Sequence, residues 1–228
     1  MIDITEALFA QRSIPRGDEA LTHVGDLTTC LRAVAYRRRG VIPEPYSATE
    51  QAKFALGLAY EQNTARTLRE AGHEIQEGVE CAAFGLDIGH PDLIQNRELL
   101  IETKTTSGGA KYPKGDKARA GQLKEVSAHH AIQAAAYALA LGLPRATVLV
   151  MHYGYECIEV AHEIRPEDYR DQIEALAAEV VALTGPEMPL PPAEPPPLDV
   201  VPYDSCGYCR FSQCERNPRH DFEAQEIA

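Results

Sequence analysis

Residues 89–104 read GHPDLIQNRELLIETK, and this stretch determines how the rest of the chain is interpreted. Side chains alternate along a β-strand, so Glu102 and Lys104 point to the same face. If the turn before this strand contains an odd number of residues, Asp92 lies directly opposite Glu102 on that face. The sequence therefore predicts a hairpin that brings two carboxylates and one ammonium group together.

This cluster has two interpretations. A Glu-x-Lys triplet is common, so Glu102 and Lys104 can form an ordinary ion pair, with Asp92 in a turn. The apolar residues 99–101 instead favour a buried central strand, where charged side chains are costly without a purpose. Two carboxylates are suitable ligands for Mg²⁺ or Mn²⁺, and a metal-bound water beside an ammonium group suits phosphodiester hydrolysis.

The remaining sequence predicts an α/β fold built around one mixed sheet. Helices are expected over residues 52–71, 125–141 and 166–184. Strands are expected within 79–94, over 99–104, and as a hairpin of 146–152 with 155–164. Residues 107–121 are expected to form a polar loop, and the Pro-rich residues 186–202 an extended connector.

The sequence Pro91-Asp92, followed by nine residues and Glu102-Thr103-Lys104, resembles the signature of the PD-(D/E)xK nuclease superfamily. The resemblance implies a restriction-endonuclease-like core, in which helices flank a central mixed sheet. It also implies that Asp92, Glu102 and the Thr103 carbonyl bind Mg²⁺ or Mn²⁺. Lys104 is then expected to help activate the attacking water.

Two further motifs resemble the RecB-like branch of that superfamily. Gln133 and Tyr137 match its Q-x-x-x-Y motif and share a helix face, which implies that they position Lys104 or the substrate backbone. The alternative is an ordinary polar stripe on an Ala-rich helix. The other motif lies in the expected helix, at residues 57–61. Relatives often carry a metal-binding His or Glu at this place; here Tyr60 stands where His is common, and the next residue, Glu61, is expected to be the third carboxylate ligand. His90 and His130 are candidate neighbours of the site.

Three of the six cysteines have closely spaced positions near the end of the chain. These are Cys206, Cys209 and Cys214, and Cys30 lies 176 positions before the first of them. Four thiolates bind Zn²⁺ or an iron–sulfur cluster equally well. The arrangement resembles the iron–sulfur RecB-like nucleases, including the CRISPR-associated Cas-four family and AddB-type nuclease domains. That resemblance implies a [4Fe–4S] cluster that joins the N- and C-terminal segments. Cys81 and Cys157 are expected to be core residues.

The net charge of −12 argues against a protein that coats nucleic acid over its whole surface. Two segments are nevertheless basic. Residues 31–39 contain four Arg and no acid, and residues 104–124 contain six basic residues and one acid. They form either two solvated charged runs or a path for DNA. The candidate DNA contacts are Arg32, Arg37, Arg38, Arg39, Lys111, Lys114 and Lys117.

These observations predict three regions: an Arg-rich N-terminal segment (1–50), a nuclease core (51–185) and a connector with a three-Cys tail (186–228). By resemblance, the function is that of a metal-dependent exonuclease on single-stranded DNA or DNA ends, in recombination, repair, phage DNA processing or CRISPR adaptation, with possible protein partners there. The alternatives are a non-catalytic DNA-binding subunit and a Zn-stabilised endonuclease. The chain has neither a long apolar run nor a signal peptide, so a cytoplasmic protein without membrane contact is expected.

Overall fold

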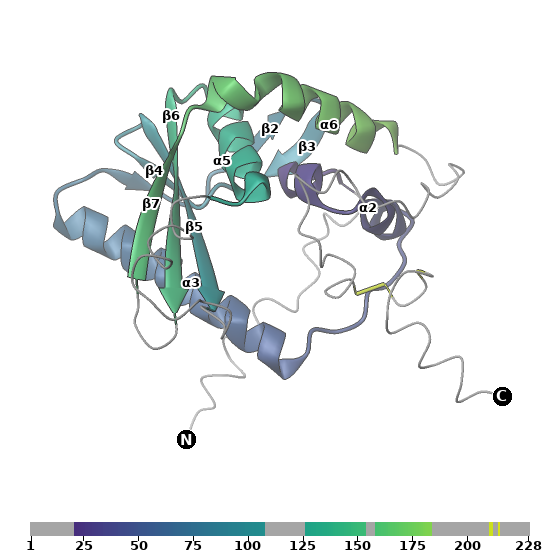
Figure 1. Cartoon of the computed structure of the whole chain (residues 1–228), viewed down its shortest axis with the longest axis horizontal. Helices are drawn as coiled ribbons and strands as arrows, with labels where there is room; N and C mark the ends of the chain where they lie inside the picture. Colours follow the sequence, from purple (N-terminus) through teal and green to yellow (C-terminus); the bar gives the residue numbers. More distant parts are fainter. Residues whose placement is uncertain (1–20, 108–125, 154–157, 184–209, 212–213, 215–228) are drawn as a thin grey trace, which may run out of the picture.

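A five-stranded mixed sheet forms the centre of the computed structural model, which describes residues 21–107, 126–153, 158–183, 210–211 and 214 (Figure 1). Its strand order is β1-β4-β5-β6-β7. The strands are β1 (Ile75–Gln76), β4 (Leu93–Gln95), β5 (Leu99–Ser107), β6 (Arg145–Tyr153) and β7 (Ile158–Ile164). Only β5 and β6 are parallel, and the other neighbours are antiparallel. The predicted α/β fold with a mixed sheet is confirmed.

Helices cover both faces of this sheet. On one face α5 (Ala128–Ala140) and α6 (Arg170–Ala182) enclose the main core, which includes Leu100, Val148 and Ile132. On the other face α3 (Ala48–Glu70) packs Ala65 against the sheet. Successive residues of a strand face opposite sides of the sheet, and both sides are covered by helices. The central strands therefore carry apolar residues on both faces.

The N-terminal elements join the same core. They are the 3₁₀ turn η1 (Val24–Thr28), which packs against α5 and α6, and helix α2 (Leu31–Arg38), which packs against α6. A two-stranded sheet of β2 (Cys81–Ala83) and β3 (Leu86–Gly89) lies beside them. Thr22 fastens η1 to β3, since its N–H and hydroxyl both donate to Asp87 Oδ2, at 2.8 and 2.7 Å. A second 3₁₀ turn, η2 (Pro166–Tyr169), leads into α6.

The expected elements are present with shifted ends. Helix α3 begins at Ala48 because Ser47 and Glu50 form a capping box. Strand β5 extends to Ser107, beyond the expected end at residue 104, because it pairs with β6 over its whole length. The polar residues at its end do not indicate this extension. The predicted hairpin of β6 and β7 is confirmed. Residues 108–125 and the Pro-rich connector lie outside the described residues. None of the described helices is long and apolar enough to cross a membrane.

Candidate active site

The hairpin of β4 and β5 places Asp92 opposite Glu102. Leu93 pairs with Ile101 and Gln95 with Leu99, so the connecting turn has three residues, and Asp92 and Glu102 lie directly beyond the Leu93–Ile101 pair. This turn is tight, because Asn96 and Arg97 both have positive φ angles (52° and 57°). Its conformation is supported by Asn96, whose N–H donates to the Glu74 carbonyl at 2.8 Å. The odd turn length assumed from the sequence is therefore present.

Glu102 is the most deeply buried charged side chain of the cluster. Only 2% of it is exposed, and Lys104 Nζ donates to its Oε1 at 2.6 Å, while Oε2 is buried without a hydrogen-bond partner. Burial raises the pKa of Glu102 to about 7, and attraction to Lys104 opposes that shift. Burial acts to lower the pKa of Lys104, but attraction to Glu102 and Asp92 outweighs it and raises the pKa. Lys104 is therefore charged at neutral pH.

Asp92 is anchored to the neighbouring strand by Thr103. Both the Thr103 N–H and its hydroxyl donate to Asp92 Oδ2 at 2.8 Å. Asp92 is close enough to Glu102 for its charge to raise the pKa of Glu102. Two carboxylates that repel each other, one with an unpartnered buried oxygen, form a site suited to a cation.

Helix α5 covers the polar cluster with the two predicted motif residues. Gln133 Nε2 donates to the Tyr137 hydroxyl at 3.3 Å, and Tyr137 is only 4% exposed. Burial raises the pKa of Tyr137, and the negative charge of Glu102 raises it further, so its hydroxyl stays protonated. A Cβ at Gly89 would lie 2.7 Å from Tyr137 Cε1, so only glycine permits the ring to pack there.

The first turn of α5 adds two histidines. The rings of His129 and His130 have centroids 3.8 Å apart. Burial and repulsion from Lys104 lower the pKa of His129 to about 4. Burial and repulsion from His129 and Lys104 lower the pKa of His130 to about 3. Both imidazoles are therefore neutral near Lys104. His130 was a candidate from its sequence position, whereas His129 was not, although His129, Gln133 and Tyr137 follow one another at a spacing of four residues on the helix.

His90 also lies beside Tyr137. Its backbone is next to the Tyr137 hydroxyl, and its side-chain Nε2 is buried without a hydrogen-bond partner. The structure thus places His90 beside Tyr137 and His130 near Lys104, and both histidines were named from the sequence.

Helix α3 directs Tyr60 and Glu61 differently. The Tyr60 hydroxyl hydrogen-bonds to Glu159 on β7, so Tyr60 does not occupy a ligand position. Glu61 is close enough to Lys104 for its charge to raise the pKa of Lys104. No group of three or more His, Cys, Asp or Glu within the described ranges is arranged to hold a metal ion. Among the residues that the structure describes, no third carboxylate or imidazole completes a metal-binding group with Asp92 and Glu102.

Two of the four predicted cluster cysteines fall within the described residues. Cys30 is the N-cap of α2, and Cys214 is buried against Tyr36 of the same helix. Phe211 stacks on Tyr36 with ring centroids 5.4 Å apart, so the C-terminal segment packs on the N-terminal helix. Cys206 and Cys209 lie outside the described residues. Cys81 is half-buried, as expected for a core cysteine, and burial raises the pKa of its thiol.

Arg37, one of the predicted DNA contacts, binds an acidic side chain of the protein itself. The Arg37 guanidinium binds buried Asp26 with two hydrogen bonds, of 2.8 and 2.5 Å. Asp26 was not singled out from the sequence, because its partner is eleven residues away. Arg32, Arg38 and Arg39 are partly exposed on or directly after α2. Lys111, Lys114 and Lys117 lie outside the described residues.

Comparisons with known proteins give the family of the chain and the likeness of its fold. The profile of the PD-(D/E)XK nuclease superfamily matches residues 7–214. A solved structure described as SSO0001 has a TM-score of 0.58 and 18% identity, covering 95% of this chain and 97% of its own. The alkaline exonuclease LHK-Exo from Laribacter hongkongensis has a TM-score of 0.51 and 14% identity, covering 78% of this chain and 91% of its own. At these identities the likeness concerns the fold. No curated protein sequence matches significantly.

Proposed function

The chain belongs to the PD-(D/E)XK nuclease superfamily, and on that premise we propose that it is a metal-dependent exonuclease acting on single-stranded DNA or DNA ends. One observation supports the proposal above all. Glu102 is buried with one oxygen on Lys104 and the other without a partner, and Asp92 stands opposite. A structural ion pair does not require a second carboxylate or an unpartnered oxygen, whereas a cation site does.

Asp92, Glu102 and the Thr103 carbonyl fit Mg²⁺ or Mn²⁺, and Glu61 is the candidate fourth ligand. A residue's N–H and C=O point to the same neighbour in an antiparallel pair, so the Thr103 carbonyl faces the Asp92 side, as its N–H does. Because Glu61 stands apart from the two carboxylates, it would bind directly only after moving, or through water. The bound cation would acidify a water molecule and neutralise phosphate charge.

The surrounding side chains hold the reacting groups in place. Charged Lys104 donates a hydrogen bond to Glu102 and can orient the attacking water or stabilise charge on the phosphate. Tyr137, kept protonated and held by Gln133, positions Lys104 or the substrate backbone. Phosphates would be contacted by Arg32, Arg38 and Arg39, and by Lys111, Lys114 and Lys117. Arg37 is not expected to contact phosphate, because its guanidinium binds Asp26.

A four-thiolate site is the second part of the proposal. Cys30, Cys206, Cys209 and Cys214 would bind a [4Fe–4S] cluster, with Zn²⁺ as the alternative. The contacts of Phe211 and Cys214 with Tyr36 support it, because they place the C-terminal segment on the helix that Cys30 caps. The cluster would hold the two segments together and act chiefly on folding. This arrangement of four cysteines is the feature that resembles the Cas-four family and AddB-type nuclease domains.

The colour of anaerobically purified protein tests the cluster. A [4Fe–4S] protein is brown, and its absorption near ~400 nm should disappear in Cys30→Ser and Cys214→Ser variants. Colourless protein with one equivalent of zinc would establish the alternative. Protein that contains neither metal would refute the four-thiolate site.

End-labelled DNA tests the nuclease. Single-stranded and duplex substrates are incubated with Mg²⁺, Mn²⁺ or EDTA, using wild type and Lys104→Ala. Cleavage by the wild type should require the metal. It should fall by roughly 10²–10⁴-fold in Lys104→Ala, with DNA binding retained. Equal inactivity of the two proteins, with binding intact, would instead identify a non-catalytic DNA-binding subunit.

A further inference from the structure

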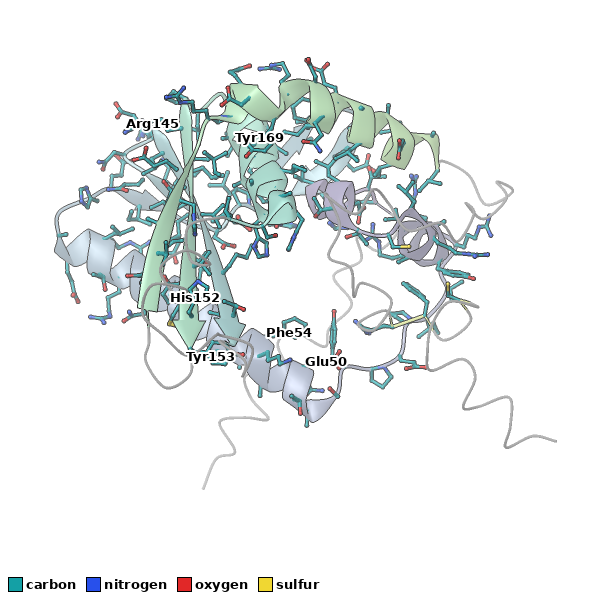
Figure 2. The ribbon with its side chains drawn as sticks, in the orientation of Figure 1. Glu50, Phe54, Arg145, His152, Tyr153 and Tyr169 are labelled. Carbon is teal, nitrogen blue, oxygen red and sulfur yellow. The ribbon has the colours of Figure 1, made fainter. Side chains whose placement is uncertain are left out.

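Two aromatic side chains are exposed together at the N-terminal end of α3. Tyr46 and Phe54 each have 41% of their surface exposed, and their rings meet edge to face with centroids 4.7 Å apart. Single exposed apolar residues are normal on a protein surface, but adjacent exposed aromatic rings often mark a binding site. In Figure 2 Phe54 projects from α3 toward the side on which α5 and α2 lie.

The pair is held in place from three segments of the chain. The Arg210 guanidinium lies 3.6 Å from the centre of the Tyr46 ring. Arg210 is itself fixed by Glu44, since Glu44 N–H donates to the Arg210 carbonyl at 2.8 Å and Arg210 Nε donates to the Glu44 carbonyl at 2.5 Å. Gln51 Nε2 donates to the Tyr46 carbonyl at 2.9 Å. The rings are therefore pre-organised although they remain exposed.

The same face of α3 leads from Phe54 to the candidate active site. Phe54, Gly57 and Glu61 have i, i+3 and i+7 spacing, which places them on one side of the helix. A Cβ at Gly57 would lie 3.6 Å from Thr105 Oγ1, directly after Lys104, and the charge of Glu61 acts on Lys104. Seven residues of helix span about 10.5 Å.

We propose that Phe54 and Tyr46, with Arg210 behind them, form a platform on which bases of single-stranded DNA stack as the strand reaches the active site. This inference rests on the proposed nuclease function. Aromatic rings bind single strands through base stacking, which every base can provide, and a guanidinium adds attraction to the phosphates. Paired bases already stack on one another and gain little from the platform, so it favours single strands over duplex DNA.

The absence of tryptophan from the sequence allows a direct test of stacking. Phe54→Trp introduces a single tryptophan, and titration with oligothymidine in Ca²⁺ should quench the tryptophan emission in proportion to binding. Thr67→Trp, an exposed position thirteen residues further along α3, is the matched control and should keep its emission. Equal emission changes in both variants, or none in Phe54→Trp despite binding, would overturn the inference.

Affinity provides the second measurement. Phe54→Ala and Phe54→Leu should both bind oligothymidine roughly tenfold more weakly than wild type and bind blunt duplex unchanged, because Leu restores bulk but not stacking. Equal loss for both DNAs would indicate a general defect and contradict a single-strand platform. The two proposals fail separately: wild type that binds DNA but never cleaves it refutes the nuclease, whereas active protein with unchanged Phe54→Ala affinity refutes only the platform.

Discussion

Glu102 is held between two opposing influences. Burial favours its protonated form and raises its pKa to about 7, whereas Lys104, 2.6 Å away, favours the ionised form. A bound divalent cation would favour ionisation much more strongly than one ammonium group. The protonation of this residue therefore links the stability of the protein to both pH and metal.

In metal-free protein the contribution of Glu102 to stability should decrease as pH rises from about 4.5 to 7, whereas the lowered pKa values of His129 and His130 make stability rise over part of the same range. In this window native Glu102 retains a proton that the unfolded chain has lost, so unfolding becomes easier with rising pH. The shift corresponds to a loss on the order of 3 kcal/mol. Urea unfolding of wild type and Glu102→Gln in EDTA isolates this loss, because the histidine contributions are common to both proteins. As pH rises, the stability of wild type should fall relative to that of Glu102→Gln, which cannot ionise there.

Added Mn²⁺ supplies the control. It should restore the stability of wild type above pH 7, because the ion binds the ionised carboxylate, and should do so far less in Glu102→Gln. The same pH dependence in both proteins would contradict the assignment of this titration to Glu102.

Tyr60 and Glu61 are adjacent but differ by about 100° around α3. We therefore expect opposite consequences from their conservative variants. Glu61→Gln should lower cleavage by at least about tenfold, as removing a metal-linked carboxylate does. Tyr60→Phe should cleave normally and lose about 1 kcal/mol of stability with the Glu159 hydrogen bond. Initial rates and thermal unfolding measure these effects. Normal cleavage by Glu61→Gln would remove Glu61 from the site.

At the scale of elements, the hairpin of β4 and β5 determines which side chains meet. Its three-residue turn sets a register that places Asp92 opposite Glu102, and the alternation of β5 directs Lys104 to the same face. The sequence predicted the shared face of Glu102 and Lys104, because strand alternation is a local property, whereas the placement of Asp92 depended on an assumed odd turn length. The length of β5 was not predictable in the same way, since its last residues depend on pairing with β6.

Two glycines on different elements should respond oppositely to alanine. At Gly89 a Cβ would lie 2.7 Å from both Tyr137 and Val24, so Gly89→Ala should cost roughly 1–3 kcal/mol and reduce cleavage by displacing Tyr137. At Gly57, within α3, the contact with Thr105 is an ordinary 3.6 Å, so Gly57→Ala should add roughly 0.5–1 kcal/mol.

Urea unfolding of both glycine variants measures these effects. A stable and fully active Gly89→Ala protein would show that the contact between β3 and α5 can relax. Such a result would also remove the argument that this contact fixes the Tyr137 ring.

At the scale of the whole molecule, the sequence indicated the partners within a motif but not those between distant segments. Gln133 and Tyr137 are one helical turn apart, so their shared face followed from spacing alone. The pairing of Asp26 with Arg37 depends on how η1 meets α2, and the packing of Phe211 on Tyr36 joins the two ends of the chain. No local periodicity encodes such contacts.

The net charge of −12 makes the placement of each arginine decisive for DNA binding. Arg39 follows α2 and is partly exposed, whereas Arg37 is bound to Asp26, whose side chain is only 3% exposed. Arg39→Gln should reduce the slope of log affinity against log salt by about 0.7 for single-stranded DNA, the effect of one lost phosphate contact. Arg37→Gln should keep the slope and instead lose roughly 3 kcal/mol of stability, because Asp26 is left buried without its partner.

Binding isotherms between low and physiological salt, with urea unfolding of the same proteins, separate these two roles. A stable Arg37→Gln protein with a reduced salt slope would show that Arg37 contacts phosphate, as its place in the Arg-rich segment first indicated. An unstable Arg37→Gln protein with an unchanged salt slope would mean that fewer basic residues contact DNA than the sequence suggests. Some of them instead form ion pairs that join elements of the protein itself. The number of phosphate contacts should then be smaller than the number of basic residues in the two segments.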